Sequence, residues 1–210
     1  MRPGVAILAL MLVLAGCGNA VQNEGVSVVL SQFRQAPEAA RFAAAVEADA
    51  PILQVGFVDR GDNANLRLER RDGAFDYWIS SDGVHLVLED GMLHSTRGLG
   101  EGLLASDLSE PLARLTALSE GPSDRFHTYL NGNDEAVTRT YRCDIRKTRE
   151  ITIPVPGGEI ATFLYRENCN SLDQQFENLY WVDPRTRQIV QSRQWAGPRV
   201  EAISTRIVLE

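Results

Sequence analysis

Lysine, histidine and cysteine are scarce in this chain of 210 residues. Lysine occurs once, as Lys147, among 21 basic side chains, and there are three histidines and three cysteines. So few thiols and imidazoles leave little material for a multi-ligand metal site, and we expect no metal and no other cofactor. The formal net charge of −7 and the pI near 5.1 argue against binding to nucleic-acid phosphates.

Catalytic signatures are missing as well. The sequence contains no Gly-x-Ser-x-Gly, His-Glu-x-x-His or phosphate-loop pattern. The glycine-rich segment 98–102 includes Glu101, which would repel a phosphate, so we interpret it as a turn between a strand and a helix. Acidic pairs such as Glu89-Asp90 fall at expected turns. Because paired carboxylates can cleave glycosidic bonds, a glycan-cleaving enzyme stays open as an alternative to our prediction of a protein that is not an enzyme.

The apolar run at the N-terminus is too short for a retained membrane-spanning helix. Val5 to Leu14 carries no charge, but this is about half of the roughly 20 residues that a spanning helix needs. With Arg2 before it and small residues after it, the run predicts a secretory signal peptide.

The end of this leader also matches the bacterial lipobox, in the order Leu14-Ala15-Gly16-Cys17. In proteins with that box the cysteine thiol receives a diacylglyceryl group, the leader is cut before it, and the new amine is acylated, for example with palmitate. Several chains on one residue make a stable anchor, whereas one chain binds a membrane marginally. The alternative is a cysteine that happens to lie at an ordinary cleavage site. Gly18, in place of an aspartate, favours the periplasmic face of the outer membrane.

These signals divide the chain into three parts. We expect a cleaved lipoprotein signal peptide at residues 1–16, a lipidated tether at 17–24, and a single β-rich periplasmic domain at 25–210.

The two remaining cysteines, Cys143 and Cys169, are predicted to pair in an oxidising compartment. The proline- and glycine-rich turn at 154–158 lies midway between them, so in a hairpin they would face each other across neighbouring strands. Two buried free thiols are the alternative. A thiol oxidoreductase is disfavoured because no Cys-x-x-Cys occurs.

Apolar periodicity predicts a mainly β protein, an antiparallel meander forming a sandwich or open barrel with one or two short helices packed on it. Residues 25–48 have helical spacing and end before Pro51, and residues 106–118 are expected to form a second helix that Ser106 could cap. From Ile52 the apolar period becomes two. Asp-Gly pairs at 72–73, 82–83 and 90–91 predict hairpin turns. Later strands are expected near 126–130, 136–149, 159–169, 177–182, 187–196 and 200–209.

Basic residues gather in the last third of the chain. Arg185, Arg187 and Arg193 have the same parity as Trp195, which predicts one strand face that carries all four. Guanidinium groups pair with carboxylates and an indole can stack on a sugar, so these residues are candidate contacts to an acidic polysaccharide or a partner protein. The alternative is structural, with arginine stems covering a strand while Trp195 fills the core.

The chain resembles the YjbF/GfcB family, the group 4 capsule polysaccharide lipoproteins. The resemblance rests on four segments in the same order: Leu14-Ala15-Gly16-Cys17; Tyr77-Trp78-Ile79 with Asp82-Gly83 and Asp90-Gly91; Ser95-Thr96-Arg97-Gly98-Leu99 with Asp107-Leu108; and Tyr180-Trp181-Val182-Asp183-Pro184 with Ser192-Arg193-Gln194-Trp195. It implies a β-rich outer-membrane lipoprotein that helps to assemble or export a capsule-like exopolysaccharide beside an outer-membrane β-barrel partner. It implies no catalytic residues. The alternative function is a periplasmic carrier or chaperone for lipid or outer-membrane proteins.

Overall fold

The computed structural model describes residues 37–133, 135–155 and 158–208. The predicted signal peptide, Cys17, the tether and the first part of the predicted helix at 25–48 lie outside these residues. The chain divides into the units Met1–Pro37 and Glu38–Glu210, and every element below belongs to the second unit.

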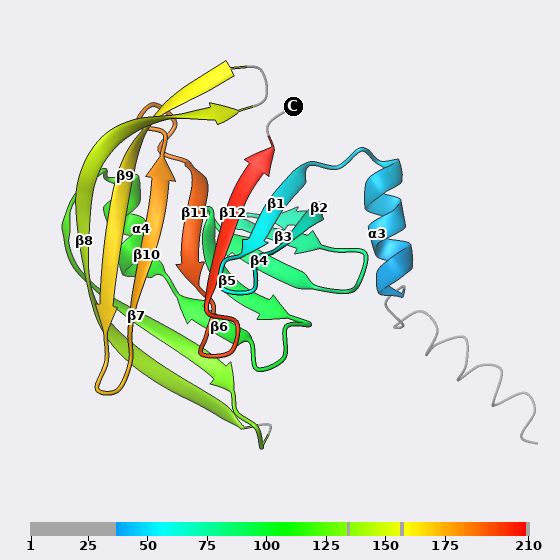
Figure 1. Ribbon diagram of the computed structural model, residues 1–210, viewed down its shortest axis with the longest axis horizontal. Coiled ribbons are helices and arrows are strands. Elements are labelled where there is room, and N and C mark those ends of the chain that lie inside the picture. Colours follow the sequence, from blue (N-terminus) through cyan, green and yellow to red (C-terminus); the bar gives the residue numbers. More distant parts are fainter. Residues whose placement is uncertain (1–36, 134, 156–157, 209–210) are drawn as a thin grey trace, which may run out of the picture. The chain divides into compact units, whose positions relative to one another are not determined.

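The described part of this unit contains two helices and twelve strands (Figure 1). The helices are α3 (Glu38–Glu47) and α4 (Ser109–Thr116). The strands are β1 (Ile52–Phe57), β2 (Asp62–Asp72), β3 (Phe75–Ile79), β4 (His85–Glu89), β5 (Met92–Arg97), β6 (Leu103–Asp107), β7 (Gly121–Leu130), β8 (Ala136–Val155), β9 (Gly158–Asn170), β10 (Gln175–Val182), β11 (Ile189–Trp195) and β12 (Ala202–Val208). Among the described residues, neither helix is long and apolar enough to cross a membrane.

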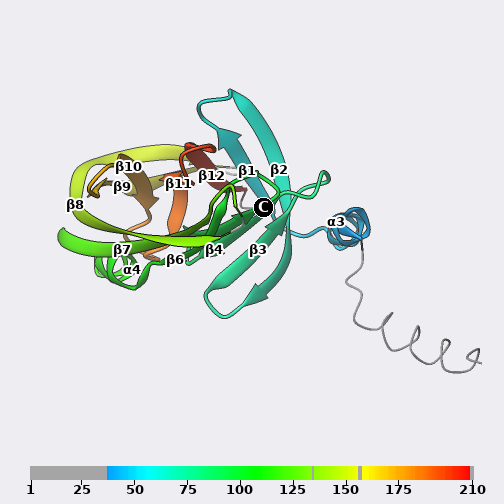
Figure 2. The same cartoon turned by 90° about the horizontal axis from the view of Figure 1, so that it is seen from below.

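All strands join one antiparallel sheet that nearly closes on itself. Its order is β5-β4-β3-β2-β1-β12-β11-β10-β9-β8-β7-β6, so two meanders meet where β1 pairs with β12. The two end strands, β5 and β6, approach each other, since the Leu103 N–H donates to the Thr96 hydroxyl (3.0 Å). Figure 2 shows β7 and β8 curving round one side of this sheet, with β2 and β3 on the other. The expectation of a mainly β meander in an open barrel is thus confirmed.

The Asp-Gly pairs form the turns that the sequence predicts. Gly73, Gly83 and Gly91 have φ values of 59°, 85° and 88°, a left-handed region in which a glycine avoids the steric cost of a Cβ. They connect β2 to β3, β3 to β4 and β4 to β5. Local turn chemistry therefore sets this half of the sheet.

The second helix differs from its prediction. It begins at Ser109, and Ser106 is a buried residue of β6, so the proposed cap was wrong. Leu108 occupies the N-cap position without a side-chain cap hydrogen bond, and the carboxylate of the preceding Asp107 accepts from the backbone N–H (3.1 Å) and the hydroxyl (2.7 Å) of Ser109. The glycine-rich segment before it consequently joins two strands. The helical spacing of Leu108, Leu112 and Leu115 is real but starts later than the cap residue suggested.

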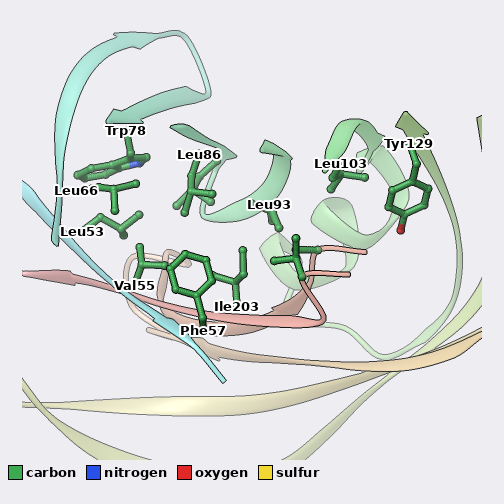
Figure 3. Close-up of a cluster of buried hydrophobic side chains, with 13 residues drawn as sticks. Leu53, Val55, Phe57, Leu66, Trp78, Leu86, Leu93, Leu103, Tyr129 and Ile203 are labelled. Carbon is green, nitrogen blue, oxygen red and sulfur yellow. The ribbon is translucent and has the colours of Figure 1, made fainter. Parts of the chain in front are cut away.

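Apolar side chains fill the inside of the sheet in clusters. Figure 3 shows one of them, in which Trp78 and Leu86 face Val55, Phe57 and Ile203 across the interior. A second cluster joins Leu108, just before α4, and Leu115 of α4 to residues of β8, β9 and β10, so α4 packs against buried side chains of those strands. Fully burying one such side chain contributes about 1.5–3 kcal/mol. The other helix, α3, is tied to β2 by Arg41, which donates to Glu69 (2.7 Å) and holds the pKa of that carboxyl below its ordinary value.

Candidate functional site

Cys17, the predicted lipid attachment site, lies outside the described residues, and its acylation stays a prediction. The other two cysteines are placed clearly. Cys143 of β8 and Cys169 of β9 are direct partners in the antiparallel ladder and form a disulfide, with their Cα atoms 4.0 Å apart. Both are buried in a cluster with Tyr141 and Phe176.

A β-bulge makes this pairing possible. Near the tip of the hairpin Val155 pairs with Gly158, a register that would place Cys143 opposite Asn170 if it continued. The register shifts by one between Lys147 and Arg149, and this brings Cys143 opposite Cys169. The sequence midpoint therefore predicted the right partners, while the position of the extra residue came from the structure.

The four candidate contact residues do not share one strand face. Arg185 and Arg187 lie in the turn before β11, so that part of the prediction was wrong. Arg185 lies 3.5 Å from Asp183, and Arg187 donates to the Thr116 carbonyl at the end of α4 (3.2 Å). The prediction assumed that odd-numbered residues from 185 to 195 lie on one continuous strand. The turn Asp183-Pro184-Arg185-Thr186 interrupts that strand, so alternation along it does not apply to Arg185 and Arg187.

Arg193 and Trp195 do belong to β11 but point to different surroundings. Arg193 is exposed on the outer face. The ring of Trp195 stacks on Phe176, with centroids 5.6 Å apart, and Phe176 stacks in turn on His127 at the same spacing. The half-buried Trp195 therefore packs against the cluster around the disulfide, and its contact to a polymer or partner stays a prediction.

Sequence reasoning missed a buried polar network inside the sheet. It consists of Arg125, His127, Glu167, Asn178 and Tyr180, each 0–1% exposed, and is called the interior network below. Arg125 Nη2 lies 3.0 Å from Glu167 Oε2 and donates to the Tyr180 hydroxyl (3.0 Å). Glu167 Oε2 also accepts from Tyr180 (2.9 Å) and from Asn178 (2.8 Å).

Burial sets the protonation of the interior network. It lowers the pKa of His127 well below the ordinary value, an effect that Arg125 reinforces, and it raises the pKa of Tyr180 well above its usual range. Burial alone would lower the pKa of Arg125, but the charge of Glu167 and the Tyr180 hydroxyl keep it raised. A neutral imidazole and a protonated phenol therefore surround one charged pair. Because its members are 0–1% exposed, we interpret the interior network as part of the packing of the sheet.

One signal could have revealed it. On β7 the polar residues Arg125 and His127 alternate with Phe126, and a normal amphipathic strand would turn the phenylalanine inward. In the structure Phe126 is 40% exposed and the polar residues are inside. The alternation of polar and apolar residues on β7 is visible in the sequence. Which set faces inward depends on Glu167 of β9 and Tyr180 of β10, which pair with Arg125 inside the sheet.

A groove lies on the outer face of β11, β12, β1 and β2, and it is the candidate binding site. It has a volume of about 410 Å³ and is called the outer groove below. Its lining residues are mostly polar: Gln54, Val55, Gly56, Asn63, Ala64, Asn65, Gln191, Ser204, Thr205 and Arg206. Amides, a hydroxyl and a guanidinium are groups that hydrogen-bond to polyhydroxylated ligands. Among the described lining residues there is no carboxylate.

The family model described as "Group 4 capsule polysaccharide lipoprotein gfcB, YjbF" matches residues 19–208. The chain belongs to the YjbF/GfcB family. A curated relative, the uncharacterized lipoprotein GfcB of Escherichia coli (strain K12), is 23% identical over 216 residues, covering 95% of this chain and 94% of GfcB.

A solved structure has a fold similar to that of this YjbF/GfcB family member. The hypothetical lipoprotein YmcC from Escherichia coli (K12) superposes with a TM-score of 0.68 at 22% identity, covering 88% of this chain and 94% of YmcC. That likeness shows the fold. Family membership makes the chain a capsule-related lipoprotein of the cell envelope.

Proposed function

We propose that the protein is anchored through acylated Cys17 in the periplasmic leaflet of the outer membrane, where it acts as a non-enzymatic factor in assembling or exporting a capsule-like exopolysaccharide. Its partner in this role is an outer-membrane β-barrel protein of the same export system. One observation carries the proposal: the lipobox ends at Cys17, and the capsule lipoprotein family match begins at residue 19 and covers nearly all of the remaining chain.

The outer groove supports binding as the mode of action. Its amide and guanidinium groups suit a polar ligand, whereas an acyl-chain carrier needs an apolar wall. Glycoside hydrolysis uses two carboxyl groups about 5–9 Å apart, and the described lining of the groove offers amides in their place. These features favour a polymer-binding assembly factor over the carrier and the hydrolase.

Two substitutions at the anchor test the proposal in cells. Cys17→Ala removes the acylation site, so we expect the protein to accumulate as unprocessed precursor or in the soluble fraction. Gly18→Asp keeps the cysteine but favours retention at the inner membrane, and Gly18→Ala is its matched control. We expect secreted polysaccharide to fall several-fold with Cys17→Ala and Gly18→Asp and to stay unchanged with Gly18→Ala.

Membrane fractionation, mass spectrometry of residue 17 and the amount of polymer in the medium are the measurements. An unmodified Cys17 in mature protein would overturn the anchor. Unchanged polymer output in a clean deletion would overturn the role in export. Crosslinking in cells should capture a β-barrel outer-membrane protein, and capture of inner-membrane proteins alone would contradict the proposed location.

A further inference from the structure

We propose that the outer groove binds a segment of an acidic glycan, with side-chain amides contacting sugar hydroxyls and Arg206 and Arg193 contacting an acidic substituent. The inference rests on the proposed function for the source of the glycan, the exported polysaccharide. It deepens that function by assigning a site and a ligand class.

Strand register aligns the polar groups of the groove. Gln191 pairs with Arg206, Arg206 with Gln54, and Gln54 with Asn65, which makes one row across β11, β12, β1 and β2. Directly opposed residues of an antiparallel ladder share a face, and neighbouring strands lie about 4.8 Å apart. The row therefore offers polar groups at regular intervals over about 14 Å, a length suited to a short oligosaccharide.

A second row lies beside the first. It runs from Arg193 through Ser204 and Gly56 to Asn63. A Cβ placed on Gly56 would lie 2.6 Å from the Ser204 hydroxyl and 3.2 Å from Asn63 Oδ1, so a larger residue would fill the floor of the groove. The glycine keeps the groove open.

The amide groups of the first row are available to a ligand. Gln54 and Asn65 are exposed and Gln191 is half-buried, and their side chains make no hydrogen bond to any other described residue. A sheet face that served only as a solvated surface would need no such alignment of amides. Each amide presents both a donor and an acceptor, which is what vicinal sugar hydroxyls require.

Positive charge is held at the same place. Arg206 donates through Nη2 to the Pro154 carbonyl at the tip of the β8–β9 hairpin, and its Nε is buried with no partner among the described residues. Figure 1 shows that hairpin extending past β10 and arching toward the end of β12. Arg193 is exposed and forms no ion pair within the described part of the chain. An anionic group on the ligand would pair with these guanidinium groups.

The first row continues to an aromatic residue. Trp181 of β10 is the ladder partner of Gln191 on the same face and is half-buried. An indole gives a flat apolar surface with one polar N–H, which suits the face of a sugar ring. Adding Trp181 extends the row by one strand.

Other ligand classes fit this face less well. All four strands of the groove lie in the middle of the sheet, with both edges already paired, so a peptide cannot add there as a strand. An acyl chain would leave the aligned amides without partners.

Binding to defined sugars tests the assignment. The probe is a set of oligosaccharide fragments cut from the polysaccharide that the producing cells secrete, and maltohexaose is the neutral control. The mature protein is titrated in detergent micelles by calorimetry. We expect the fragments to bind, maltohexaose to bind much more weakly, and added salt to weaken the binding of the fragments.

Variants locate the site. Gln54→Ala with Asn65→Ala removes two exposed amides, and we expect about tenfold weaker binding. Arg193→Ala should weaken binding and reduce its salt dependence. The matched control is Asn168→Ala, an exposed amide on the outer face of β9, which should bind as the wild type does.

The outcomes separate the site from the function. No binding of the fragments, or full binding by the double amide variant, would overturn the groove assignment. Maltohexaose binding as tightly as the fragments would overturn the acidic ligand. If deletion of the protein lowers polymer secretion while the groove variants bind normally, the site is wrong and the proposed function stands. If deletion leaves secretion unchanged, the proposed function fails whatever the groove binds.

Discussion

The pair of Arg125 and Glu167 shows what one buried charge requires. Burial of either charge by itself would be costly, and the pair persists because Tyr180 and Asn178 supply further hydrogen bonds. Glu167 Oε1 and Arg125 Nε have no hydrogen-bond partner among the described residues, so not every polar atom of the network is hydrogen-bonded. Each member therefore depends on the others for its stability.

Arg125→Met should lower the free energy of unfolding by about 3–5 kcal/mol, because it leaves the Glu167 carboxylate buried without its counter-charge. The double variant with Glu167→Met should lose less than the sum of the two single losses. Urea denaturation measures both. Arg142→Met, at an exposed arginine that pairs with Asp124, is the control and should leave the stability near that of the wild type, because solvent screens an exposed ion pair. An Arg125→Met protein as stable as the control would contradict this account.

At the scale of single elements, the β8–β9 hairpin combines local and distant constraints. Its turn, its bulge and its disulfide must agree for Cys143 to meet Cys169. The hairpin also reaches Arg206 of β12 through the Pro154 carbonyl. One long hairpin thus links the interior near the disulfide to the end of the outer groove.

Replacing both Cys143 and Cys169 by alanine should reduce the free energy of unfolding by about 3.5 kcal/mol, from the loss of a crosslink between residues 26 apart. Denaturation with and without a reducing agent measures the effect. The reductant should destabilise the wild type and leave the double variant unchanged. Equal sensitivity of both proteins to the reductant would show that the stabilisation has another source.

At the scale of the whole molecule, Gln194 joins the two meanders across the interior. Its Oε1 accepts from the Leu93 N–H (2.8 Å), and its Nε2 donates to the Gly91 carbonyl (3.1 Å), so β11 satisfies backbone groups at the start of β5. Ile189 of β11 also lies against Gly91, where a Cβ would be 2.8 Å from it. The end strand β5 is therefore held by a strand far from it in the sheet order.

Gln194→Leu should destabilise the protein by about 1–3 kcal/mol, because the buried Leu93 N–H and the partly buried Gly91 carbonyl lose their partner. Amide hydrogen exchange should become faster in β5 before it does in β9. Gln188→Leu, at an exposed position in the turn before β11, is the control and should leave both stability and exchange near wild type. Unchanged protection of the Leu93 amide in Gln194→Leu would contradict the proposed link.

The sequence by itself determined the antiparallel meander, the Asp-Gly turns, the cysteine partners and the family, whereas the leader with its lipobox stays a prediction. Each of these is encoded within a few neighbouring residues or in a spacing along the chain, so it can be inferred from the sequence before the tertiary structure is known. Arg185 and Arg187 were misplaced because parity holds only while a strand continues.

Only the tertiary structure decided the interior network, the bulge that aligns the disulfide, and the outer groove. The inward direction of Arg125 depends on Glu167, and the groove depends on residues of β11 and β12 meeting those of β1 and β2, more than a hundred residues away in the chain. Such sites arise from register between distant strands, because each strand alone offers only an alternation of polar and apolar side chains, with no record of what will lie beside it.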